Sequence, residues 1–371
     1  MEGKIGDSWQ RSVKANTYNF YLLSKYRSHL FGLAILCIML FHSPLQWQFS
    51  DHYVRYVKLY LDFGVDLFLF LSGIGLYYSI SKDKNIVKFY KRRLLRILPA
   101  YIPVACLWFF YWDFSWPYEN FSKLLSNCII FFNDIMLISF WTKGNLTEWF
   151  VAIIVIFYLI YPFIYRLLIR LRTRGIIFLI AICIGIVGFL LYFIDFHKLP
   201  DKYNWMCIAL PRIPILLIGC WIAPKVKKCN EINNRLVTIC AIIAIVFIIF
   251  FLINPPILST NIFFKRLLYG PFAFCIAIWF SNTAEIVNNR LILKCFGWIG
   301  LFTFEIYLLH EKIIWLLSGF HLESDILINV SAISITLITV PFYKCFYNWL
   351  MSLCFWLCDL CFTRAFFLRQ L

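Results

Sequence analysis

Long apolar runs recur along the whole chain, and short polar segments separate them. Each run holds about 17–25 mostly apolar residues, the length that an α-helix needs to cross a bilayer. The runs do not alternate apolar and polar residues with a period of two, as the strands of a membrane β-barrel would. The pattern predicts an all-α, polytopic bundle of about ten transmembrane helices, near residues 31–48, 60–80, 97–112, 149–168, 175–194, 205–222, 237–254, 268–283, 297–317 and 326–343.

Two further apolar segments do not fit this count. Residues 124–141 contain Asn127, Asn133 and Asp134, and if they crossed the membrane, every later loop would change sides. We therefore expect an interfacial or re-entrant segment on the outer face. Residues 345–362 are rich in Phe, Trp and Cys. As an eleventh span they would carry the basic C-terminus outside, so we expect an amphipathic helix on the inner surface.

Lys and Arg fall mainly on one side of this arrangement. The connections assigned to one side, with both termini, carry 25 of these residues, and the connections on the other side carry 8. The positive-inside rule places both termini in the cytoplasm. The formal net charge of +16 then reflects topology, with anionic lipids and an anionic cofactor as partners and no nucleic acid. The polar, basic start predicts no cleavable signal peptide. We expect a cytoplasmic N-terminal segment, a ten-helix membrane domain and a C-terminal amphipathic tail, over 1–30, 31–343 and 344–371.

The cysteines give no sign of disulfides or of a metal. Most of the fourteen lie inside apolar runs, where Cys behaves as a small hydrophobic residue. The closest cluster is Cys354, Cys358 and Cys361, but no His lies near it. We therefore expect neither a disulfide framework nor a metal site.

Four ionisable side chains lie inside predicted spans at a similar depth. They are His42, Asp66, Arg212 between two prolines, and His310. His42 is six residues from the outer end of its predicted span, roughly 9–10 Å into the membrane. An ionisable group at such a depth is costly and is a functional-site hypothesis by default. We expect a polar, water-accessible outer cavity in which Asp66 orients His42, so that His42 acts as a general base.

Each of these residues also has a structural interpretation. A single buried His often serves only as a hydrogen-bonding group, and Asp66 could cap a pocket of water. Glu311 and Lys312 could form an ion pair at the membrane rim. The agreement in depth between four helices favours a cavity over four unrelated structural roles.

Four cations open the third predicted span, namely Lys91, Arg92, Arg93 and Arg96. Arg93 and Arg96 are three residues apart, so they share one helix face. Guanidinium groups bind phosphate in a bidentate manner, which suits a polyphosphate ligand. A topological anchor that binds lipid headgroups explains the same cations, and the pattern leaves both interpretations open.

Five stretches in this order resemble the acyltransferase-3 superfamily, integral-membrane enzymes that O-acylate extracytoplasmic sugars. They are GLAILCIMLFH, GVDLFLFLSG, KRRLLRILPAY, PRIPILLIG and EIYLLHEKI, and residues 148–164 resemble a further span of the family. The resemblance implies a ten-helix core, a cytoplasmic acyl-CoA donor, an essential His42, and Arg93 and Arg96 beside the donor. The family commonly has a basic residue eleven positions before its histidine. Phe31 stands there in this chain, and Arg27 is the nearest substitute.

The resemblance implies an acyltransferase, and we expect it in a bacterial cytoplasmic membrane. It would move an acyl group from cytoplasmic acyl-CoA to a hydroxyl of an extracytoplasmic sugar or polysaccharide. Acetyl, and hence acetyl-CoA, is the default because a narrow tunnel past Ser72 and Gly73 would suit a small group. Arg212 or His310 would stabilise the oxyanion or position the acceptor. We expect no metal. Donor-binding residues would be Arg92, Arg93, Arg96 and Arg27, and acceptor-binding residues Glu148, Trp149 and Glu311.

Two other classes of function stay open at this stage. Trp112, Trp116 and Trp149 could stack on sugar rings or simply form the aromatic belt of the membrane. A transporter or flippase of a lipid-linked or anionic sugar could use Arg212 in a broken helix as its substrate site. Such a protein would often carry inverted repeats, and we find none in the sequence. A non-catalytic scaffold would tolerate substitution of the intramembrane His and Arg.

Overall fold

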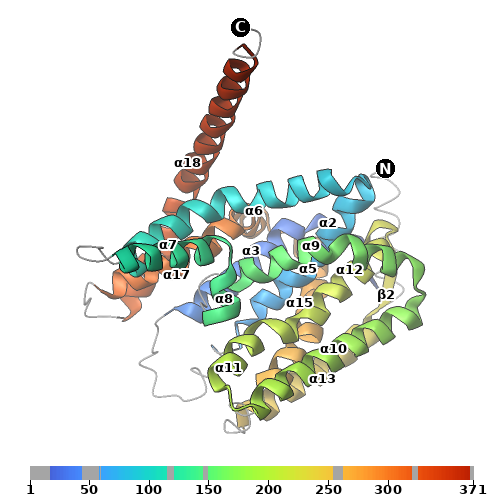
Figure 1. Ribbon diagram of the computed structural model, residues 1–371. Coiled ribbons are helices and arrows are strands. Elements are labelled where there is room, and N and C mark those ends of the chain that lie inside the picture. Colours follow the sequence, from blue (N-terminus) through green and yellow to red (C-terminus); the bar gives the residue numbers. More distant parts are fainter. Residues whose placement is uncertain are drawn as a thin grey trace. The chain divides into compact units, whose positions relative to one another are not determined.

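The computed structural model describes residues 17–43, 58, 60–114, 121–144, 149–253, 262–319 and 325–367. Almost all of them are helical (Figure 1). One short antiparallel pair of strands, β1 (Thr17–Asn19) and β2 (Glu231–Asn233), is the sheet in the described part of the chain. The helices are α2 (Tyr21–Lys25), α3 (Arg27–His42), α5 (Phe63–Lys82), α6 (Ile86–Trp108), η1 (Phe109–Asp113), α7 (Phe121–Ile135), α8 (Ile138–Lys143), α9 (Trp149–Arg170), α10 (Thr173–Phe196), α11 (Pro200–Ala209), η2 (Leu210–Arg212), α12 (Ile213–Lys227), α13 (Asn234–Ile253), α15 (Ile262–Val287), α16 (Arg290–Leu301), α17 (Thr303–Ser318) and α18 (Asp325–Phe367).

The helices confirm a polytopic membrane protein. Seven are long and apolar enough to cross a bilayer, or up to eight if α16 and α17 form one broken span. Helices α3 and α13 are apolar but shorter within the described residues. Every apolar run that was predicted to span the membrane contains a helix. An α-helix satisfies its backbone hydrogen bonds internally, as a hydrocarbon environment requires.

The chain divides into two compact units. Unit 1 consists of Met1–Phe89 and Ile153–Thr303, and unit 2 of Tyr90–Ala152 and Phe304–Leu371. In unit 1, α5 packs against α3, α12 and α15, and α3 packs against α16. Most of α5 is therefore buried inside the protein. Because α5 is the central helix of unit 1, its polar residues face other helices.

Two glycines allow α5 and α12 to approach each other closely. A Cβ at Gly73 would lie 2.3 Å from the carbonyl oxygen of Leu216, and a Cβ at Gly219 would lie 2.1 Å from that of Phe70. Small residues at such contacts let the helix backbones meet, as is common in membranes. The backbone of α12 occupies the space beside Gly73, where the sequence predicted a narrow tunnel. The close contact gives no support to the choice of acetyl.

An ion pair and a hydrogen bond also connect α2 and the start of α3 to α15 in unit 1. The Lys25 ammonium lies 2.6 Å from the Glu285 carboxylate, and the Tyr26 hydroxyl donates to the same carboxylate at 2.8 Å. Burial and this carboxylate raise the pKa of Tyr26 well above its ordinary value. The Tyr26 hydroxyl therefore keeps its proton and its role as donor.

Several helix boundaries differ from the sequence prediction. Helix α3 ends at His42, and Ser43 has a non-helical ψ of 128°, so His42 is not six residues inside its helix. The ninth predicted span is broken at Phe302 into α16 and α17. Residues 124–141 form two short helices, α7 and α8, separated by Leu137 with a φ of 61°. Neither of the two is among the candidate spans of the described chain.

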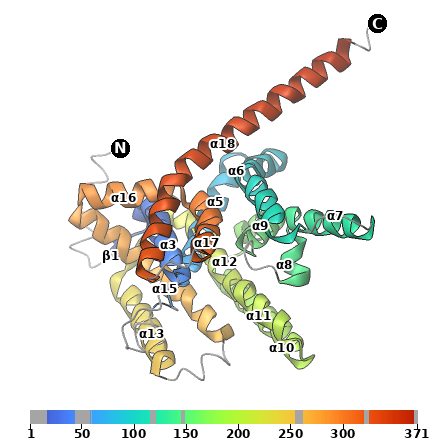
Figure 2. The same ribbon diagram turned by 90° about the vertical axis from the view of Figure 1, so that its left-hand side faces the viewer.

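In unit 2, α18 is one continuous helix of 43 residues (Figure 2). At 1.5 Å per residue it is roughly 65 Å long, about twice the thickness of the hydrocarbon core. It runs through residue 344, where the sequence predicted that a separate tail begins. The Tyr343 hydroxyl donates to the carbonyl oxygen of Ala100. Tyr347 and Lys344 contact Glu305 at 2.6 and 3.3 Å, so α18 is tied to both α6 and α17.

Candidate functional site

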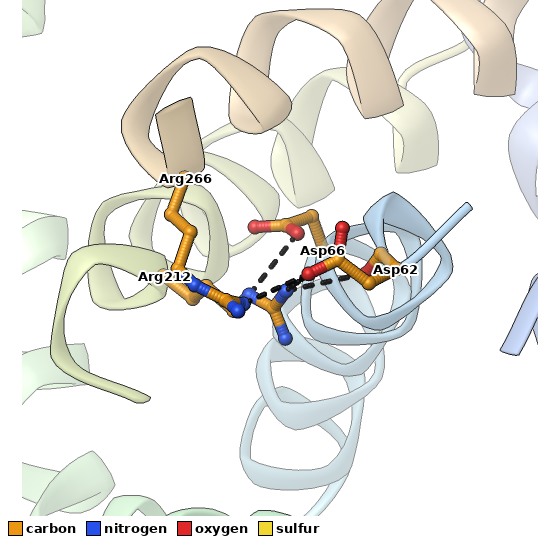
Figure 3. A network of polar contacts seen from close by, with 4 residues as sticks. All are labelled: Asp62, Asp66, Arg212 and Arg266. Atoms are coloured by element: carbon orange, nitrogen blue, oxygen red, sulfur yellow. Dashed lines mark hydrogen bonds and ion pairs between the residues drawn. The ribbon is translucent and has the colours of Figure 1, made fainter. Parts of the chain in front are cut away.

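A buried cluster of two carboxylates and two guanidinium groups lies in unit 1 (Figure 3). We call Asp62, Asp66, Arg212 and Arg266 the ion-pair cluster. Arg212 lies between the carboxylates, with 2.9 Å from Nη2 to Asp62 Oδ2 and 3.3 Å from Nε to Asp66 Oδ2. Arg266 Nη1 reaches the same oxygen of Asp62 at 3.0 Å. The side chain of Arg212 is 1% exposed and that of Asp66 is 0% exposed, so water screens these charges little.

Local sequence explains why Arg212 points into the protein. The turn η2 interrupts the helical segment between α11 and α12, and Pro211 and Pro214 flank Arg212 on either side. A proline has no amide hydrogen and clashes with the preceding turn, so two of them break a helix. Arg212 Nη2 also lies 3.3 Å from the main-chain oxygen of Asp62. The break therefore fixes Arg212 against the start of α5.

The two carboxylates are placed by the beginning of α5. Asp62 precedes the first residue of this helix and Asp66 lies in its first turn. Residues four apart share a helix face, which lets one guanidinium contact both carboxylates. The N-terminus of a helix also favours negative charge. The charges of Arg266, Arg212 and Lys265 act on Asp62, and the Tyr269 hydroxyl hydrogen-bonds to it.

His42 lies close to this cluster. The charged groups that act on the imidazole are Asp62, Lys58 and Arg212. The Asp66 carboxylate accepts no hydrogen bond from another described residue, and it is ion-paired with Arg212. The ion pair of Asp66 is with Arg212, Asp62 is a carboxylate whose charge acts on His42, and the orientation of His42 by Asp66 stays a prediction.

The sequence interpretation missed Asp62 and Arg266. Asp62 precedes Asp66 by one helical turn in LYLDFGVD, and Arg266 follows Lys265 near the start of the apolar run IFFKRLLYG. Asp62 lies inside the predicted span 60–80, and Arg266 lies just before the predicted span 268–283. Their position within or beside an apolar run could have marked them as candidates, because a charged side chain there can point toward the protein interior as well as toward water.

In unit 2, His310 is 1% exposed, and its Nδ1 lies 2.9 Å from the carbonyl oxygens of Ile306 and Tyr307. Nδ1 therefore carries a proton, because both neighbours only accept hydrogen bonds. Lys312 is buried, with Nζ 5.2 Å from the centre of the Trp108 ring. Glu311 is partly buried.

The basic residues of α6 do not all face the same way. Arg93 is 9% exposed, whereas Lys91, Arg92 and Arg96 are exposed. Arg92 and Arg96 are four residues apart and share the exposed face. The exposed pair is thus Arg92 with Arg96, and not Arg93 with Arg96 as the spacing predicted.

Arg27, the expected substitute for the family's basic residue, contacts α5 and a neighbouring side chain of α3, all within unit 1. Its Nη2 donates to the main-chain oxygen of Leu71 at 3.2 Å. Its guanidinium carbon lies 5.1 Å from the centre of the Phe31 ring. The residue at the family's basic position and its substitute therefore touch each other.

The remaining predicted residues give less information. Trp149 begins α9 and is buried. Glu148 and Trp116 lie outside the described residues, as do the side chains of Trp112 and of the Cys354 cluster. Within the described ranges, no three His, Cys, Asp or Glu side chains come together as a metal site would require.

Comparison with known proteins gives one match. A family model described as an acyltransferase domain matches residues 32–363, which is most of the 371-residue chain. The matched range includes His42, the whole ion-pair cluster and the basic residues of α6. No curated protein and no solved structure matches the chain.

Proposed function

The chain belongs to the acyltransferase-3 family, and from this premise we propose that it transfers an acyl group from cytoplasmic acyl-CoA to a hydroxyl of an extracytoplasmic sugar or polysaccharide. The observation that carries the proposal is an imidazole, His42, beside a buried and charge-compensated cluster. Buried ionisable groups of this kind are costly and mark functional sites in membrane proteins.

In this proposal His42 is the general base. It removes the proton from the sugar hydroxyl as the hydroxyl oxygen attacks the carbonyl carbon of the thioester. The carbon–sulfur bond breaks, and His42 returns the proton to the departing thiolate of CoA. The products are a sugar ester and free CoA, so no other reactant is needed. The negative charge of Asp62 favours the protonated imidazole that forms during the step.

Arg212 acts in this proposal through Asp62. Because Arg212 contacts Asp62 at 2.9 Å and Asp66 at 3.3 Å, we assign it to holding these carboxylates in place and not to the oxyanion. His310 stays a candidate for stabilising the oxyanion. Glu311, Trp149 and Glu148 stay candidates for binding the acceptor.

The donor is proposed to be acyl-CoA, with acetyl-CoA as the first donor to try. Its phosphate groups would bind Arg92 and Arg96, whose exposed guanidinium groups share one face of α6. Arginine binds phosphate in a bidentate manner. Arg93 and Arg27 are buried or partly buried, so we give them a supporting role. The excess of Lys and Arg on one side of the membrane supports a cytoplasmic location for both termini, and we propose a bacterial cytoplasmic membrane.

The test measures the ester content of cell-surface glycans by mass spectrometry in a deletion strain. The strain is complemented with wild type, with His42→Ala, or with His197→Ala as a control, because His197 is an exposed histidine at the end of α10. We expect wild type and His197→Ala to restore a defined ester and His42→Ala to restore none at equal expression. Full restoration by His42→Ala would contradict the proposed base. A change in glycan export with every ester in place would favour a transporter.

A further inference from the structure

Five buried polar atoms gather at the ion-pair cluster without a hydrogen-bond partner among the described residues. Leaving aside Arg212, which contacts both carboxylates, they are Tyr60 Oη, Asp62 Oδ1, Asp66 Oδ1, Asp66 Oδ2 and Arg266 Nε. Buried polar groups in native proteins are almost always hydrogen-bonded, since leaving one unpaired costs free energy. A concentration of such atoms in one place therefore indicates a ligand that supplies the missing partners.

Tyr60 is the clearest of these groups. The residue is 7% exposed, and its ring is fixed by an edge contact with Tyr269, at 6.2 Å between ring centres. Lys265 Nζ lies 4.9 Å from the centre of the same ring. The hydroxyl, in contrast, contacts no partner in the described chain. The packing holds the ring in place, and the hydroxyl has no structural role that the contacts reveal.

Asp66 is the strongest acceptor without a donor. It is fully buried, and its ion pair with Arg212 at 3.3 Å supplies an opposite charge but no hydrogen bond. A carboxylate has two oxygens that each accept hydrogen bonds. Apart from the contact of Oδ2 with Arg212 and a hydrogen bond with its own main chain, the Asp66 carboxylate is available to a ligand that brings donors.

The free atoms define the chemistry of this ligand. Three are carboxylate oxygens that need donors, and Tyr60 Oη and Arg266 Nε can both donate. A hydroxyl group both donates and accepts, so a molecule with several hydroxyls matches the set. An anionic ligand would be repelled by the carboxylates of Asp62 and Asp66, and a cationic ligand would be repelled by the guanidinium groups of Arg212 and Arg266. An uncharged, hydroxyl-rich ligand avoids both repulsions.

We propose that Tyr60 and Asp66 bind hydroxyl groups of the acceptor, and that the acceptor unit is an uncharged sugar with at least two free hydroxyls besides the one acylated. This inference rests on the proposed acyl transfer for the identity of the ligand. Tyr60 and Asp66 are binding residues, and His42 remains the group that takes part in the chemical step.

Tyr60→Phe provides the sharpest test because it removes only an unpartnered hydroxyl. Protein purified in detergent is given acetyl-CoA and methyl glycosides of glucose, galactose and mannose, together with their monodeoxy analogues. We expect the KM for the best glycoside to rise about 3- to 10-fold, the value of one neutral hydrogen bond. The kcat, the KM for acetyl-CoA and the melting temperature stay unchanged. For the deoxy analogue that lacks the bound hydroxyl, the variant and wild type become equal.

Asp66→Asn is the second variant, since it keeps the shape of the side chain and replaces one acceptor with a donor. It raises the KM for the same glycosides by a larger factor. Tyr192→Phe and Asp195→Asn, at exposed positions of α10, are the matched controls and leave the KM unchanged. An unchanged KM in both Tyr60→Phe and Asp66→Asn would overturn the inference.

A binding measurement separates this inference from the proposed function. A ligand that binds the folded state raises its melting temperature, so we measure the shift that each glycoside causes. If wild type is stabilised by the glycosides, and Tyr60→Phe is stabilised less, the sugar site stands even if no acyl group is transferred. If wild type shows neither stabilisation nor transfer with any glycoside, both the sugar site and the proposed function fail.

Discussion

Replacing Arg212 by methionine should destabilise the protein strongly. Arg212 supplies the opposite charge to Asp66 at 3.3 Å and shares Asp62 with Arg266. Without Arg212, Asp66 is left as a fully buried carboxylate whose charge no described residue pairs. Breaking a buried ion pair by removing one partner costs about 3–5 kcal/mol. At about 2–4 °C per kcal/mol, the melting temperature should fall by roughly 6–20 °C.

The free-energy cost of removing one partner of an ion pair depends on how deeply the pair is buried more than on the distance between the charged atoms. The ion pair between Lys25 and Glu285 is shorter, at 2.6 Å, but the side chains are 43% and 20% exposed. Exposed pairs are worth about 0–1 kcal/mol because water screens them and the side chains lose conformational freedom. Lys25→Met should therefore lower the melting temperature by no more than a few degrees, about 2–4 °C. It serves as the matched control for Arg212→Met.

Thermal unfolding of the purified variants in one detergent provides the assay. A second variant, Arg212→Met with Asp66→Asn, restores the charge balance, because Asp62 keeps Arg266 at 3.0 Å. We expect this double variant to recover most of the lost stability. The reasoning is refuted if Arg212→Met costs no more than Lys25→Met, or if the added Asp66→Asn lowers the melting temperature further.

Two other predictions concern helix packing and the donor. Gly219→Ala would place a Cβ 2.1 Å from a backbone oxygen of α5 and should cost about 1–3 kcal/mol, whereas Gly185→Ala, with nothing within 4 Å, should stabilise by up to about 1 kcal/mol. Thermal unfolding measures the stability of both variants, and an equal change of melting temperature in Gly219→Ala and Gly185→Ala would disprove the close contact. The double variant Arg92→Gln with Arg96→Gln should raise the KM for acyl-CoA about tenfold or more with an unchanged melting temperature. Arg170→Gln, at an exposed arginine of α9, is its control, and an unchanged KM in the double variant would place the donor elsewhere.

The helices were predictable because their signal is local. The apolar runs have the length that a bilayer requires, so each predicted span contains a helix. Their ends were harder to place. The prediction separated residues 326–343 from a tail beginning at 344 on the evidence of charge, whereas the backbone continues as α18 through both. The break at Phe302 also has no proline of its own, and α16 instead packs against α3 through Gly300, where a Cβ would lie 1.8 Å from Ser28.

The sequence indicated that Asp66 and Arg212 lie near each other, but it did not indicate which way each helix faces. The sequence placed Asp66 and Arg212 at one level, and the structure pairs them at 3.3 Å. It could not show which face of each helix points inward, because a rotation about the helix axis leaves depth unchanged. For this reason the action of Asp62 on His42 was not foreseen from the sequence. The same limit explains why Arg93 is buried while Arg92 and Arg96 are exposed.

The most direct test of the account is acyl transfer by purified protein in proteoliposomes. Wild type and His42→Ala are compared with labelled acetyl-CoA and glycan from the deletion strain, and both labelled ester and free CoA are measured. The account predicts that wild type forms ester and CoA in equal amounts and that His42→Ala, with an unchanged melting temperature, forms neither. Ester formation by His42→Ala at the wild-type rate would contradict it, as would the absence of CoA release from wild type.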